Sequence, residues 1–251
     1  MKGKIETVQR STLSANFSIF ELLLRCMGRC AAVVILFTMI AEGVLLYVMM
    51  QGETMYYENL FARGATKPLY IGFVALACVF LYSKKSERTN LDYTLKRLAV
   101  KPASIFIDET LFVAGTYLVF WGFAVAVLCG FGFYFNANIS QAYNKDVGVL
   151  LAFARTHDLF FWLPVGSASL ALRQAVGVLA LSASIARTNY FRRKGESKLV
   201  GLIITSYLFL RAFFENLTNA TSNLAMAAML LVMLIFSVGT TIFEESEEQW
   251  G

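Results

Sequence analysis

Three ionisable side chains stand inside apolar stretches of the sequence: Glu42, Arg173 and Arg211. If each stretch crosses a membrane, each charge lies about 12 or 13 residues from the basic end, which is roughly 18–20 Å deep. A charge at that depth costs about 2.5–3.5 kcal/mol on insertion scales, so it is expected to face the bundle interior, form a pair or line a wet cavity. We therefore expect Glu42 to pair with Arg173 or Arg211, or all three to line a translocation path.

Other acidic residues offer simpler arrangements. Glu215 follows Arg211 by four residues, so these two side chains could pair along one helix near the far interface. Asp108 and Glu109 begin the third apolar stretch, where negative charge suits a helix N-terminus. The sequence leaves open whether the buried charges are structural or functional.

The sequence lacks the usual patterns of membrane enzymes. His157 is the only histidine, so a pair of histidine metal ligands cannot form. Ser167 and Ser169 lack the Gly-x-Ser-Gly pattern of a serine protease, and Cys26 and Cys30 have no second pair of metal ligands. No phosphate-binding Gly-x-x-x-x-Gly-Lys loop occurs, so any ATP would be hydrolysed by another chain. We expect no catalytic residue, no metal and no cofactor on this chain.

The composition is that of a protein solvated by lipid. Hydrophobic residues make up 57% of the 251 residues and charged residues only 16%, and the mean hydropathy is +0.60. A soluble domain of this composition would have more apolar surface than it could bury. The net charge of +5 is explained by membrane topology and anionic lipid, so we do not expect a nucleic-acid partner.

The chain divides into six apolar stretches, each roughly long enough to cross about 30 Å of hydrocarbon as a helix. They cover residues 30–50, 68–83, 110–133, 166–186, 199–215 and 224–243. No soluble domain interrupts them. The sequence therefore predicts an all-α polytopic membrane protein, with six transmembrane helices in a single domain over residues 1–251.

Basic residues are concentrated in three places that share one side of such a bundle. Sixteen of the 22 Lys and Arg residues lie in the N-terminal arm, between stretches two and three, or between stretches four and five. The opposite side has four. Because Lys and Arg in short loops are retained in the cytoplasm, we expect a multi-pass plasma-membrane protein with both termini cytoplasmic.

Two segments outside the apolar stretches are predicted to be helical. In residues 16–29, Phe17, Phe20, Leu24 and Met27 form an apolar stripe, which favours an amphipathic helix lying flat in the interface before span one. The alternative is that this segment extends span one. The long link 134–165 is expected to carry an interfacial or partly re-entrant helix between residues 147 and 162.

The link between stretches two and three predicts a short cytoplasmic helix over about residues 90–100, bounded by a capping pattern and by Pro102. Leu91, Leu95 and Leu98 recur on one face of this helix, and basic residues point elsewhere. Such a face requires a partner. That partner is either the lipid surface or a cytosolic protein with a groove for a short helix.

This link resembles the first cytoplasmic loop of permease subunits of ABC-2-type exporters, on the residues Tyr93-Thr94-Leu95, then Arg97-Leu98, then a proline before the next span. The six-span layout, the N-terminal amphipathic helix and the chain length are also similar. Many such permeases carry a structured hairpin between spans five and six, whereas the longer far-side link here lies between spans three and four.

The resemblance implies a permease that works as a pair, with a second copy or a homologous permease. It also implies that a coupling helix docks on a cytosolic ABC ATPase through Leu91, Tyr93, Leu95, Arg97 and Leu98. By the same resemblance, residues 187–198 form a smaller ATPase contact, or else only a topology anchor. The substrate would be a peptide, drug or lipid-like molecule. An ATP-independent channel or carrier with a mid-membrane charged site, or a non-transporting scaffold, remains the alternative.

Overall fold

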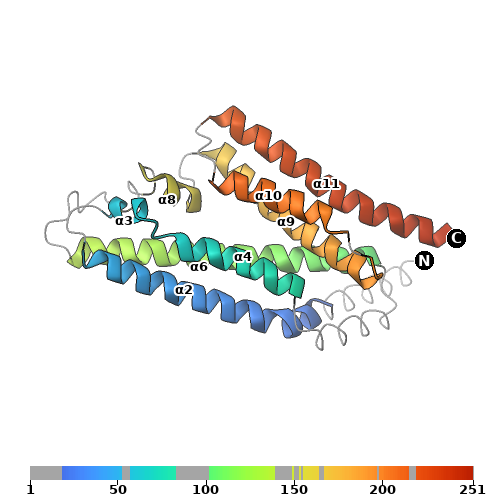
Figure 1. Cartoon of the computed structure of the whole chain (residues 1–251), viewed down its shortest axis with the longest axis horizontal. Helices are drawn as coiled ribbons and strands as arrows, with labels where there is room; N and C mark the ends of the chain where they lie inside the picture. The colour runs from blue at the N-terminus through green and yellow to red at the C-terminus, as the bar shows by residue number, and fades with distance from the viewer. Residues whose placement is uncertain are drawn as a thin grey trace, which may run out of the picture.

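Helices are the only regular secondary structure in the residues that the computed structural model of the chain describes (Figure 1). Those residues are 19–52, 57–82, 102–138, 149, 153, 155–163, 167–196, 198–214 and 219–250. An apolar helix satisfies its own backbone hydrogen bonds, which a hydrocarbon solvent requires. The predicted all-α class is therefore confirmed.

Within the described residues, four helices are long and apolar enough to cross a membrane: Ile19–Met50, Ala103–Asn138, Ala168–Arg193 and Ala220–Glu244. They correspond to the turn η1 (Leu24–Gly28) with α2 (Arg29–Met50), and to α6 (Pro102–Asn138), α9 (Ala168–Arg193) and α11 (Ala220–Trp250). These helices are compatible with a multi-pass membrane protein.

Two further apolar helices are shorter. They are α4 (Lys67–Tyr82), with 16 residues, and α10 (Val200–Phe214), with 15. At 1.5 Å per residue they cover about 24 Å and about 22 Å, less than the roughly 30 Å of a hydrocarbon core. In the described residues each of the six apolar stretches thus contains a helix, while six complete crossings stay a prediction.

The helix ends are sorted between the two ends of the bundle (Figure 1). One end gathers the starts of α2, α6 and α10 and the ends of α4, α9 and α11, and we call it the basic end. The described basic residues in or near it are Arg25, Arg29, Arg187, Arg192, Arg193, Lys194 and Lys198. The short helices α3 (Glu58–Ala62) and α8 (His157–Trp162) lie at the opposite end. This sorting agrees with the charge distribution expected of alternating crossings.

Helix α9 is the central element. It contacts α4, α6, α10 and α11, and every residue from 180 to 191 is buried. Small residues allow the neighbouring helices to approach closely. At Gly177, for example, an added Cβ would lie 3.1 Å from Cδ2 of Phe209 on α10. Among the four long apolar helices, α9 is therefore the one most deeply buried by the rest of the protein.

Both ends of α9 are capped. The Ser167 hydroxyl accepts a hydrogen bond from the Leu170 amide at the start. At the end, Gly195 has φ of +88°, and the Glu196 amide donates to the Phe191 carbonyl. This is a Schellman motif, in which glycine takes the left-handed conformation that other residues avoid. The motif fixes the direction in which the chain leaves α9 at the basic end.

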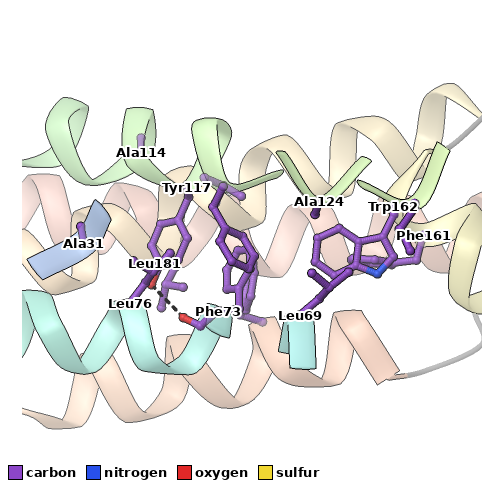
Figure 2. Packing of buried hydrophobic residues seen from close by; sticks show 14 of the residues in the cluster. Ala31, Leu69, Phe73, Leu76, Ala114, Tyr117, Ala124, Phe161, Trp162 and Leu181 are labelled. Carbon is purple, nitrogen blue, oxygen red and sulfur yellow. Dashed lines mark hydrogen bonds between the residues drawn. The ribbon is translucent and has the colours of Figure 1, made fainter. Parts of the chain in front are cut away.

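An aromatic core joins α4, α6 and α10. The rings of Phe73 and Tyr117 stack with centroids 4.4 Å apart, and Phe73 also stacks on Phe209 at 5.3 Å. Figure 2 shows Phe73 and Tyr117 side by side, with the Tyr117 hydroxyl directed at the Phe73 carbonyl oxygen 3.5 Å away. Further along, the Trp121 indole donates to the Trp162 carbonyl, 2.7 Å away, and this bond ties α8 into the bundle.

The described part of the N-terminal amphipathic segment extends the first long helix. Residues 19–50 form one continuous helical segment with a π-helical turn at Leu24–Gly28, the arrangement that the sequence offered as its alternative. The predicted stripe was wrong in part, because its members do not share one face: Phe20 and Leu24 are exposed, whereas Met27 is buried. A π turn adds a residue to the helical repeat, so a stripe assigned at regular spacing shifts to another face.

Candidate functional site

Glu42 lies fully buried on α2, against α6. Within the described residues neither of its carboxylate oxygens has a hydrogen-bond partner. Tyr57 and Cys129 are close by, and the Tyr57 hydroxyl donates to the Leu128 carbonyl, 2.7 Å away. Burial raises the pKa of Tyr57, and the neighbouring Glu42 and Cys129 raise it further. Glu42 is thus a buried acidic side chain near a phenol whose hydroxyl already donates a hydrogen bond to another group.

The two arginines that were predicted to lie inside the membrane do not join Glu42 in the described part of the chain. Arg173, on α9, is only 2% exposed, and Arg211 lies on an exposed face of α10. Neither forms an ion pair or hydrogen bond with Glu42. Beside Arg173, the Gln174 amide donates to the Phe161 carbonyl and so links α9 to α8. The predicted pairing of Glu42 with either arginine is therefore not formed.

A group of hydroxyls joins α9, α10 and α11 inside the bundle. The Ser184 hydroxyl donates to Thr205 Oγ1, 2.9 Å away, and is hydrogen-bonded to Ser237 Oγ at 3.1 Å. All three side chains are buried. We call this group the hydroxyl junction. Hydrogen bonds of this kind hold apolar helices together where no hydrophobic driving force exists between them.

A second polar group joins α4, α6 and α9 at the basic end. Glu109 of α6 is fully buried and accepts hydrogen bonds from the Asn189 amide at 2.5 Å and from Arg193 Nη2 at 2.9 Å. The Asn189 amide also donates to the carbonyl of Phe80 on α4, 3.3 Å away. We call these residues the carboxylate clamp. It provides the buried carboxylate with both a positive charge and a neutral donor.

The second basic link is attached to α11. Lys198 forms an ion pair with Glu244 at 2.5 Å and with Glu196 at 3.0 Å, and these hydrogen bonds raise the pKa of Lys198. Arg187 Nε donates to Thr240 Oγ1, 2.8 Å away. The last turns of α9 and the connection to α10 are therefore both held to α11, through Arg187 and Lys198 respectively.

The predicted ATPase-binding residues, Leu91, Tyr93, Leu95, Arg97 and Leu98, lie outside the described residues. The helices that flank them are described. Tyr82 ends α4 and Pro102 begins α6, both at the basic end (Figure 1). The carboxylate clamp lies close behind these two helix ends.

Comparison of the chain with models of protein families, with curated proteins and with solved structures found no match. In the described ranges, no group of three or more His, Cys, Asp or Glu side chains could hold a metal ion. The polar interior around α9 is the candidate site, because its side chains form hydrogen bonds with α4, α6, α10 and α11.

Sequence reasoning missed most of this polar interior. It placed Glu109 at the start of the third span near the cytoplasmic membrane surface, whereas α6 already begins at Pro102 and the Glu109 side chain is fully buried between helices. It assigned no role to Ser184 or Asn189. The signal that would have found them is the run 182–189, where polar and small residues interrupt an otherwise apolar stretch. Polar side chains inside a span are expected to bond to neighbouring helices.

Proposed function

We propose that this chain is the membrane-spanning permease subunit of an ATP-binding-cassette exporter, working as a pair and driven by ATP hydrolysed on a separate cytosolic subunit. The observation that carries the proposal is the carboxylate clamp. The family-like segment around Leu95 connects α4 and α6, and the clamp holds both of these helices to α9 through Glu109 and Asn189.

The clamp gives a physical route for the coupling step. A movement of the link between α4 and α6 would reach α9 through hydrogen bonds to the Glu109 carboxylate as well as through apolar contacts. Helix α9 contacts α10 and α11, and the hydroxyl junction joins all three. Closure of the ATPases would tilt α4 and α6, turn α9 with them, and change access to a cavity between the two permeases. The substrate class is a peptide, drug or lipid-like molecule.

A change on the leucine face tests the proposed docking. Leu95→Asp places a charge in the apolar strip and should abolish copurification of a P-loop ATPase while membrane insertion stays intact. Val100→Asp is the matched control, because it adds the same charge on the opposite side of the expected helix. The measurement is a detergent pulldown of the full chain from its native host. Retained association in Leu95→Asp, or equal loss in both variants, would refute the docking.

The geometry of Glu42 favours a second candidate, an ATP-independent carrier with an acidic site in the membrane. A buried carboxylate without a partner is expensive to maintain and often marks an ion or proton pathway. Glu42→Gln keeps the shape and removes the charge. We expect folded yield to be unchanged, because the described contacts include no hydrogen bond to lose. Retained transport in a reconstituted assay supports the permease, whereas lost transport in the folded variant supports the carrier.

A further inference from the structure

A groove of about 500 Å³ opens between α10, α11 and the last turns of α9, at the basic end. Its long walls are apolar and face outward: Val200 and Ile204 come from α10, and Val232 and Phe236 from α11. Val200 is 70% exposed and Val232 is 63% exposed. These walls are continuous with the lipid-facing surface of the two helices, so hydrocarbon chains have direct access to the groove.

The end of the groove nearest the helix termini is cationic, and Arg187 forms its floor. Only 6% of this residue is exposed. Its guanidinium carbon lies 4.9 Å from the centre of the Phe191 ring and 4.8 Å from that of Phe236, which fixes the plane of the group. Gly201 leaves room for it, since an added Cβ there would lie 2.8 Å from Arg187 Nη1. The guanidinium is therefore held in one orientation before any ligand arrives.

The Arg187 guanidinium has N–H donors that are available to a ligand. Within the described residues, Nε donates to Thr240 and the two terminal nitrogens donate to no protein atom. The nearest carboxylate, Glu244, is hydrogen-bonded to Lys198 instead and acts on Arg187 only through space. The charged residues that line the groove are Arg187 and Lys198, and the nearby carboxylates Glu196 and Glu244 both form ion pairs with Lys198.

We propose that this groove binds one anionic phospholipid, with its phosphate on the terminal nitrogens of Arg187 and an acyl chain along the α10–α11 walls. Arginine binds phosphate through parallel hydrogen bonds, and basic pockets between membrane helices are typical sites for anionic head groups. A soluble anion would leave the apolar walls unused. A second copy of this chain would have to bring a carboxylate to Arg187 across a lipid-facing surface. The proposal requires a membrane and is independent of the transport mechanism.

The test compares two lipids on the full chain purified in neutral detergent. Phosphatidylglycerol and phosphatidylcholine with identical acyl chains are added, and bound lipid is counted by native mass spectrometry. We expect phosphatidylglycerol to be retained about fivefold to tenfold better, the factor expected for one well-placed basic contact. Arg187→Gln should remove this preference. Arg25→Gln is the matched control, because Arg25 is at the same end of the bundle, is 73% exposed, and does not line the groove.

A second variant covers the case in which Arg187→Gln fails to fold. Val232→Trp fills the groove from an exposed position and keeps both cations, so it should lower retention of phosphatidylglycerol without unfolding the chain. Equal retention of the two lipids by the native chain would overturn the proposal, as would an unchanged preference in Val232→Trp. Inorganic phosphate that displaces phosphatidylglycerol completely at millimolar concentration would also overturn it. So would a spontaneous disulfide dimer of Val232→Cys that excludes lipid, because a second copy would then cover the groove.

Discussion

Replacement of Arg193 by methionine tests whether the carboxylate clamp holds α4, α6 and α9 together. Glu109 is fully buried and Arg193 is 13% exposed, so the variant leaves a buried carboxylate with only the Asn189 amide as hydrogen-bond partner in the described residues. Loss of one member of a buried ion pair costs about 3–5 kcal/mol. We expect the lower value, about 3 kcal/mol, because the Asn189 hydrogen bond remains. For a chain of this size that corresponds to a fall in Tm of about 6–12 °C.

The assay is thermal unfolding of the full chain in detergent, followed by size-exclusion chromatography. Arg25→Met is the control, since Arg25 loses the same charge from an exposed pair with Glu21 and should change stability by less than about 0.5 kcal/mol. Adding Glu109→Leu to Arg193→Met removes both buried charges and should recover most of the loss. The reasoning is refuted if Arg193→Met unfolds at the same temperature as Arg25→Met, or if the double variant is less stable than Arg193→Met alone.

Two further predictions use the same assay. Ser184→Ala removes the centre of the hydroxyl junction and should lower the free energy of unfolding by about 1 kcal/mol. Ser182→Ala is the control and should be nearly neutral, because the Ser182 hydroxyl donates only to a carbonyl of its own helix. Equal losses in the two variants would contradict a stabilising role for the junction. Gly72→Ala places a Cβ 2.5 Å from Thr38 Cγ2, where α2 meets α4, and should cost about 1–3 kcal/mol. Gly115→Ala meets open space and should be neutral or stabilising. Adding Thr38→Ala removes the two closest atoms, Cγ2 and Oγ1, but leaves Cβ at 3.0 Å, so it should restore part of the stability lost in Gly72→Ala; no recovery at all would show that the contact is not the cause.

The helices themselves could be predicted from hydropathy, and their lengths only in part. The stretch 30–50 corresponds closely to α2, and 68–83 to α4. The stretch 110–133 was too short, because α6 runs from Pro102 to Asn138. Hydropathy reports the part of a helix that lipid can cover, and a helix continues beyond that part wherever its polar residues find protein or water.

The polar contacts could not be predicted, since they depend on which helices cross. Glu109 and Asn189 are 80 residues apart in the chain, and nothing local in either segment identifies the other as a partner. The proposed partners of Glu42 were chosen by depth alone. Depth places residues at one level in a membrane but leaves their rotation about the helix axis undetermined, and that rotation decides which side chains meet.

The central position of α9 has a consequence for the order of biogenesis. Its mean hydropathy is 1.5, against 2.1–2.3 for the other three long helices. A nascent chain that has made α9 but not yet Ala220–Trp250 would lack the α11 partners of Ser184 and Arg187, whereas the partners of Asn189 on α4 and α6 would already be present. We expect the ribosome-bound intermediate to keep α9 at the insertion channel until the last helix emerges, so that lateral release into the bilayer and tertiary folding occur as one event.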